Sequence, residues 1–172
     1  MSVGVRVFAL VFLSSVVQVS MLAPVEVFGA APDLLLVVVV VIALLRGPIV
    51  GATAGFAGGL LVDVATLSTL GVTSLLLSVS GYWAGRYGDT TGRGRAYAPY
   101  LAVGVIAVLA GVGGYLVHFL LGDDVTAATA LAPVLPSAVA DVLLAVPVLW
   151  ACRRLVGSAL PIERAREMEL VV

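Results

Sequence analysis

The sequence predicts an all-α integral membrane protein, built as a bundle of six transmembrane helices. Of its 172 residues, 62% are hydrophobic and only 11% are charged, whereas a soluble domain has about 25% charged residues. The apolar residues gather in six segments, at about 5–23, 32–46, 47–62, 67–85, 98–121 and 131–152. No connection is long enough to separate two domains, so residues 1–152 form one transmembrane domain and residues 153–172 a polar cytoplasmic tail.

Segment 5–23 is predicted to be a retained first span rather than a cleaved signal peptide. Its apolar run continues past Gln18 to Ala23, and the large side chains of Met21 and Leu22 do not suit a cleavage site. Gln18, with a serine one turn before it, gives this helix a polar face.

Segment 32–46 is short for a span. Its twelve apolar residues, Leu34 to Leu45, would extend for about 18 Å as a helix, against a hydrocarbon core of about 30 Å. Pro32 suits the first turn, where its missing N–H group would lack a partner anyway. A re-entrant hairpin with the next segment is an alternative, but it would bring Arg46 near mid-bilayer at a cost of at least about 2.5 kcal/mol. We favour two short spans, which place Arg46 at the inner surface.

Segment 47–62 has a glycine at every fourth position, and an acid continues the row: Gly47, Gly51, Gly55, Gly59 and Asp63. Positions four apart lie on one slowly drifting face of a helix, and small residues there let another backbone approach closely. Packing within the chain's own bundle is the favoured interpretation, and a groove for a helix of another protein is the alternative.

The next two segments carry interfacial residues. Arg86 follows segment 67–85 and ends the sequence GYWAGR, whose tyrosine and tryptophan are typical of an aromatic anchor at the membrane surface. The chain's one histidine, His118, lies near the outer end of segment 98–121, where an interfacial polar residue is expected.

Asp141 lies at the middle of segment 131–152. An ionised carboxylate at that depth costs about 2.5–3.5 kcal/mol, and Arg153, about 18 Å further along the helix, is too distant to pair with it. We therefore expect a neutral carboxyl that faces the bundle and donates a hydrogen bond to a backbone carbonyl or to Gln18. A structural bond between helices and a proton-relay role are both open for this residue.

The placement of the basic residues predicts the orientation. All nine are arginines, and six spans put every one of them on the same side: Arg6, Arg46, Arg86, Arg93, Arg95, Arg153, Arg154, Arg164 and Arg166. Because arginine and lysine concentrate in cytoplasmic loops, we expect this side and both termini to be cytoplasmic.

No catalytic, cofactor or metal site is predicted. The single cysteine, Cys152, excludes an internal disulfide and a cysteine-based metal cluster. There is no nucleophile elbow of the G-x-S-x-G type, and the Gly/Arg-rich stretch at 90–97 lacks the spacing of a phosphate-binding loop. The net charge of −1 gives no basic excess for nucleic acid.

Residues 18–86 resemble the MreD family, the membrane subunit of the bacterial rod-shape, or elongation, system. The features that carry the resemblance are Gln18, Pro24, Gly29, PDLLL (32–36), ALLRG (43–47), GATAGFAGGLLVD (51–63), LG (70–71) and GYWAGR (81–86). The second half matches mainly in layout, with a fifth span and a proline-bearing sixth span that ends in arginines.

The resemblance implies a six-helix fold similar to the substrate-binding subunits of energy-coupling-factor vitamin transporters, and a non-enzymatic role. It implies the bitopic protein MreC as a partner, and cooperation with the glycosyltransferase RodA, a class B penicillin-binding transpeptidase and the actin-like MreB in peptidoglycan synthesis. The family often carries asparagine at the position of Asp141. Two other hypotheses are a vitamin-binding transporter subunit, which needs an outward polar or aromatic pocket, and an intramembrane hydrolase, for which residues are lacking.

Overall fold

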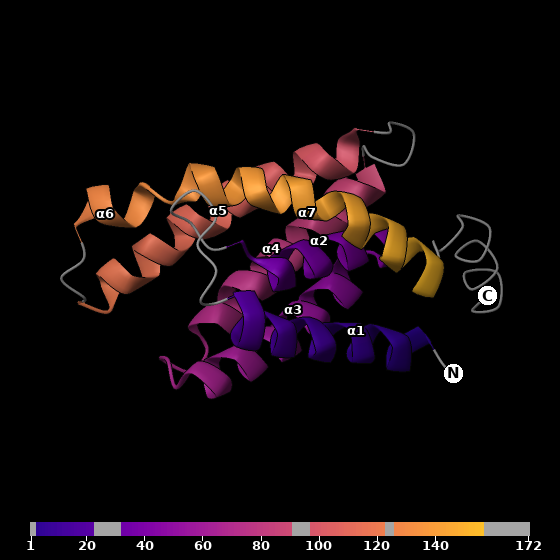
Figure 1. Cartoon of the computed structure of the whole chain (residues 1–172), viewed down its shortest axis with the longest axis horizontal. Coiled ribbons are helices and arrows are strands. Elements are labelled where there is room, and N and C mark those ends of the chain that lie inside the picture. Colours follow the sequence, from indigo (N-terminus) through magenta and orange to yellow (C-terminus); the bar gives the residue numbers. More distant parts are fainter. Residues whose placement is uncertain (1–2, 23–31, 91–96, 123–125, 157–172) are drawn as a thin grey trace, which may run out of the picture.

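The computed structural model describes residues 3–22, 32–90, 97–122 and 126–156, and the regular structure in these ranges is helical. In chain order the elements are α1 (Val3–Val17), the π-helix η1 (Gln18–Leu22), α2 (Leu34–Arg46), α3 (Pro48–Thr66), α4 (Val72–Thr90), α5 (Ala98–Leu120), α6 (Ala127–Leu131) and α7 (Val134–Leu155). Since η1 continues α1 and α6 leads into α7, the described residues form six helical segments (Figure 1). The predicted all-α class is confirmed, and the predicted tail beyond residue 156 lies outside the described residues.

Three of these segments are long and apolar enough to cross a membrane: α3, α5, and α6 with α7 taken together as residues 127–155. Residues 4–20 and α2 are apolar but shorter. α4 matches α3 in length, but Arg86 and Asp89 lie in its last turns and make it more polar. These helices indicate a multi-pass membrane protein, and the crossing of all six segments stays a prediction.

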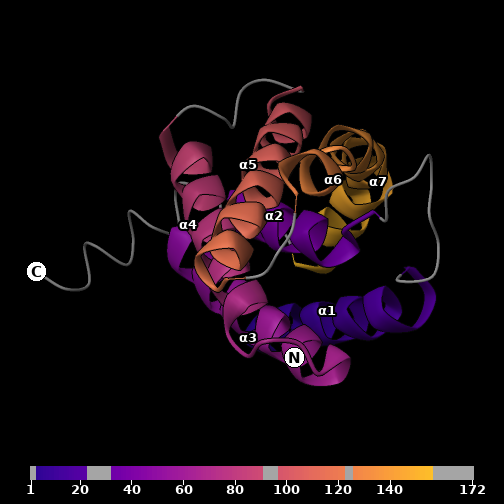
Figure 2. The same cartoon turned by 90° about the vertical axis from the view of Figure 1, so that its left-hand side faces the viewer.

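α2 lies at the centre of the bundle. It contacts α1, α3, α4, α5 and α7, which surround it when the bundle is viewed along its long axis (Figure 2). Ten of its thirteen residues are buried, as expected of a helix that is apolar on every side. Because α2 packs among other helices rather than lipid, its length of about 20 Å does not have to match the greater thickness of the bilayer core.

α2 and α7 run side by side in the same direction (Figure 1). Where α2 begins, the backbone N–H of Asp33 donates to Asp141 Oδ1 on α7 over 2.7 Å. Where both helices end, the Arg46 guanidinium donates to the carbonyl of Val156. These two bonds fix the offset of the two helices along the bundle axis.

One end of the bundle holds every arginine that the structure describes, and we call it the arginine end: Arg6, Arg46, Arg86, Arg153 and Arg154. Arg6 Nη1 donates to the carbonyl of Leu155 over 3.2 Å, which brings the start of α1 to the end of α7. α4 ends here too, since a Cβ on Gly88 would lie 3.2 Å from the Cα of Leu44. Asp89, in the last turn of α4, accompanies these arginines, whereas the start of α4 lies toward the opposite end.

Several helices differ from their predicted limits. α3 extends to Thr66 instead of residue 62, and α4 covers Val72–Thr90 instead of 67–85, so Arg86 lies within it. The cause is the turn between them, where Leu67 and Gly71 have φ values of 53° and 97°, and such left-handed residues end helices. Similarly, the two arginines assigned to the start of the tail belong to the last turn of α7, where cations complement the helix dipole.

Candidate functional site

Three polar side chains meet at the start of α2, and we call them the cap cluster: Gln18 from η1, Asp33 directly before α2, and Asp141 from α7. Asp141 Oδ1 accepts from the N–H of Asp33 over 2.7 Å. Gln18 Oε1 accepts from the N–H of Leu34 over 2.8 Å, and Asp33 Oδ1 accepts from that of Leu36 over 2.9 Å. Each member therefore binds a different backbone N–H group of one helical turn.

The cap cluster meets a physical requirement of a helix that starts inside a membrane protein. The first N–H groups of a helix have no partner within it, and in hydrocarbon each unpaired group costs several kcal/mol. α2 starts beside Asp141, which lies midway along the apolar segment 127–155. The cluster supplies the acceptors that water supplies at an exposed helix start, and its acidic members complement the positive end of the helix dipole.

Gln18 binds the chain on both sides of Asp33. Its Nε2 donates to the carbonyl of Pro32 over 3.2 Å, while its Oε1 accepts from the N–H of Leu34. One side-chain amide thus fixes the backbone that leads into α2. Gln18 is also the first residue of η1, and short π-helical turns of this kind are frequent at functional sites.

The structure adds an acceptor role to the one expected of Asp141. The side chain is buried in the bundle, as expected, with 2% of its surface exposed, and its Oδ1 accepts a hydrogen bond from the backbone N–H of Asp33. The reason is that a buried helix start offers donors without partners, so an acid placed there serves as their acceptor. Donation by the carboxyl to a carbonyl or to Gln18 stays a prediction. Asp33 was not singled out from the sequence, although an aspartate directly before an apolar run is a known N-cap signal.

The glycine row brings α3 and α4 together backbone to backbone. Each of its glycines within α3 lies so close to α4 that an added Cβ would lie 2.6 Å or less from a backbone atom: Gly51 from the oxygen of Gly81 (2.6 Å), Gly55 from the oxygen of Leu77 (2.3 Å) and Gly59 from the nitrogen of Ser74 (2.5 Å). Real Cβ atoms essentially never come that close to another atom. This face of α3 is therefore covered by the chain's own α4, as in small-xxx-small helix pairs.

Gly47 acts differently from the rest of the row, because it lies in the junction between α2 and α3. Its φ of 98° is left-handed, which glycine adopts without strain. Gly85 of α4 packs on this junction, and a Cβ there would lie 2.3 Å from the Cα of Pro48. Gly81 and Gly85 were not predicted from the sequence as partners of the row, although their spacing of four within GYWAGR was an available signal.

Asp63 ends the glycine row and caps the next helix. It is completely buried, and its carboxylate accepts from the N–H groups of Gly71 (2.8 Å) and Thr73 (3.3 Å) and from the hydroxyl of Ser68 (3.4 Å). A side chain of α3 thus satisfies N–H groups at the start of α4, much as the cap cluster does for α2.

The predicted site residues therefore fall in three places. Gln18 and Asp141 meet at the start of α2, the glycines and Asp63 lie along the α3–α4 contact, and Arg86 is exposed near the end of α4. Among the described residues, no group of three or more His, Cys, Asp or Glu side chains could hold a metal ion. The polar groups bind backbone and so hold the helices in fixed positions.

The family model for rod shape-determining protein MreD matches residues 2–155, a range that includes every helix described above. Comparisons with curated proteins and with solved structures gave no match. MreD proteins are non-catalytic membrane proteins that determine rod shape. The chain therefore belongs to the MreD family.

Proposed function

We propose that the chain is a scaffold subunit of the bacterial elongation complex, which binds MreC and supports peptidoglycan synthesis and cell shape. RodA, a class B penicillin-binding protein and MreB are the further partners that family membership suggests. The chain's own contribution would be a rigid set of helices, since the cap cluster and the glycine row tie α1, α2, α3, α4 and α7 to one another.

The observation that carries this proposal is the central position of α2 inside a bundle that the family match covers from end to end. A solute-binding subunit needs a polar or aromatic pocket open to the outside. In this chain an apolar helix, ten of whose thirteen residues are buried, fills the middle of the bundle. This arrangement favours a scaffold over a vitamin carrier.

The proposal includes the topology. All six segments would cross the membrane, as in the substrate-binding subunits of energy-coupling-factor transporters. The arginine end would be cytoplasmic because positive residues concentrate on that side, and both termini would then be cytoplasmic. The short α2 is accommodated because neighbouring helices, rather than lipid, surround it.

Co-purification and cell shape test the proposal together. The tagged chain is co-expressed with MreC from the same organism and purified in mild detergent, with an unrelated bitopic protein as the control. MreC and not the control is expected in the eluate. Deletion of the gene is expected to round or swell cells that elongate by lateral wall synthesis, without loss of vitamin uptake. A deletion strain that kept its shape and lost accumulation of one solute would establish the transporter function instead.

A further inference from the structure

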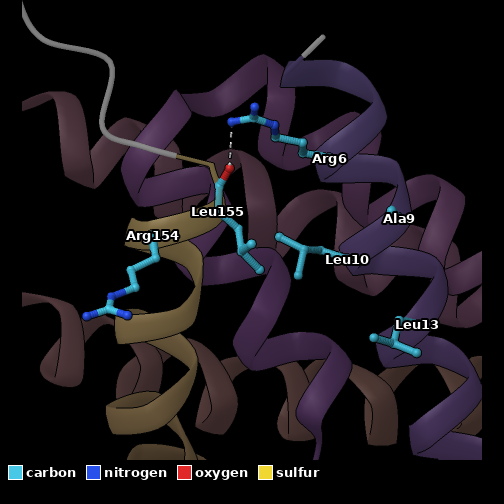
Figure 3. Close-up of a pocket in the computed structure, with 6 residues that line it drawn as sticks. All are labelled: Arg6, Ala9, Leu10, Leu13, Arg154 and Leu155. Atoms are coloured by element: carbon cyan, nitrogen blue, oxygen red, sulfur yellow. Dashed lines mark hydrogen bonds between the residues drawn. The ribbon is translucent and has the colours of Figure 1, made fainter. Parts of the chain in front are cut away.

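A groove of about 530 Å³ lies between α1 and α7 at the arginine end. It is lined by Arg6, Ala9, Leu10 and Leu13 from α1 and by Arg154 and Leu155 from α7, as Figure 3 shows. The guanidinium of Arg6 reaches across the groove to the carbonyl of Leu155 at 3.2 Å. This bond closes the groove at the end where both helices meet.

The walls of the groove divide into an apolar length and a cationic end. Arg6, Ala9, Leu10 and Leu13 are spaced i, i+3, i+4 and i+7, so they share one face of α1. The lining of the groove therefore runs along α1 for about 10 Å from Arg6 to Leu13, of which the apolar part, Ala9 to Leu13, takes about 6 Å. The charge lies at the surface end. Leu13 has 60% of its surface exposed, so the groove opens outward, toward the lipid of a surrounding membrane.

The cationic end has unused hydrogen-bonding capacity. A guanidinium has five N–H donors, and the one hydrogen bond that Arg6 makes in the described part of the chain is the bond to Leu155. Arg154 lies over the ring of Trp150, 4.4 Å from its centroid, and Figure 3 shows its guanidinium turned away from Leu10 and Leu13. Arg6 is therefore the direct ligand, while Arg154 lines the groove and adds positive charge.

We propose that this groove binds one anionic phospholipid of the leaflet at the arginine end. Arg6 contacts the phosphate, and an acyl chain lies along Ala9, Leu10 and Leu13. A guanidinium binds phosphate oxygens through two parallel N–H groups, and basic pockets between helices on the cytoplasmic side are suited to anionic head groups. An acyl chain gains little free energy by moving from the bilayer into an apolar groove. The preference for an anionic over a neutral phospholipid therefore comes from the arginine.

The dimensions of the groove favour a lipid over its competitors. A partner helix, about 10–12 Å wide with its side chains, would have to leave the groove at its surface end. The Arg6–Leu155 bond spans the groove at that end and blocks this path. A free phosphate ion would use the arginine and leave the apolar length unfilled. A phospholipid matches both parts.

Native mass spectrometry of the full chain tests the proposal. The protein is purified in detergent with equal amounts of phosphatidylglycerol and phosphatidylcholine that carry the same acyl chains. Wild type is expected to retain the anionic lipid with a preference of about fivefold, the effect of one arginine near a membrane surface. Arg6→Gln should abolish most of this preference. Arg153→Gln, which removes the same charge from an exposed residue outside the groove, should keep it.

A second pair of variants leaves the charge unchanged. Ala9 is exposed and lines the groove, so Ala9→Trp should fill the apolar length and lower lipid retention. Phe8→Trp changes the adjacent, exposed residue outside the lining and should leave retention intact. Inorganic phosphate should not displace the lipid.

Three results would overturn the proposal: no preference in wild type, equal losses in Arg6→Gln and Arg153→Gln, or displacement of the lipid by inorganic phosphate. Melting temperatures of all variants identify any that fail to fold. If Arg6→Gln is one of these, the comparison of Ala9→Trp with Phe8→Trp decides, and equal retention in those two would also reject the groove.

Discussion

Asp141 and Gln18 each stabilise a helix to which they do not belong. Asp141, on α7, accepts from the N–H of Asp33, and Gln18, on η1, accepts from the N–H of Leu34. Both N–H groups lie at the start of α2, where the helix itself offers no acceptor. At the residue scale, each of these N–H groups therefore needs an oxygen acceptor within hydrogen-bonding distance, and that acceptor does not have to be negatively charged.

This requirement separates two substitutions of Asp141. Asp141→Asn keeps an oxygen that accepts from Asp33, so its stability and its ability to restore rod shape should stay near wild type. Asp141→Leu leaves the N–H unpaired, which costs about 1–3 kcal/mol for a buried donor. Thermal unfolding in detergent and complementation of a deletion strain at matched expression measure both effects. If Asn proved as damaging as Leu, the titratable proton itself would be needed, and a relay role would replace the structural one.

At the element scale, the α3–α4 pair depends on glycine more strictly than the other helix contacts do. The glycine row was visible in the sequence because its spacing of four is a property of one segment. Its partner face on α4 was not recognised, since a face acquires its role only when another helix lies against it. The cap cluster could not be recognised for the same reason. Its members are far apart in the chain, and they come together only because all three bind N–H groups at the start of α2.

Gly55→Ala is expected to destabilise the bundle, because the new Cβ would lie 2.3 Å from the carbonyl oxygen of Leu77. Backbone atoms cannot yield as a flexible side chain does, and overpacking of this kind costs about 1–3 kcal/mol. Gly114→Ala on α5 is the matched control, since its Cβ would meet Leu76 Cδ1 at an ordinary 3.6 Å. There, alanine's better helix propensity should leave the melting temperature unchanged or raise it. Equal melting temperatures for both variants would mean that α3 and α4 are less close than described.

At the scale of the whole molecule, the all-α class could be predicted from the sequence, and the gathering of the arginines followed from their alternation along the six segments. Both are properties of composition and order. The central position of α2 could not be predicted in this way, because an apolar run is compatible with lipid on one side or with protein on every side. Its shortness was the available clue, since a helix shorter than the bilayer core is better accommodated among other helices.

The orientation of the bundle is the last prediction, and accessibility of single cysteines tests it. In a Cys152→Ser background, which removes the one native thiol, Leu70→Cys lies in the exposed turn between α3 and α4. Because this turn is opposite the arginine end, a membrane-impermeant thiol reagent should label it in intact cells. Arg153→Cys, exposed in the last turn of α7, should react only after permeabilisation. The reverse pattern would invert the topology. Arg46→Cys tests the two short spans: it should behave like Arg153→Cys, because Arg46 bonds the carbonyl of Val156 at the same end, and labelling from outside would reject a crossing by α2.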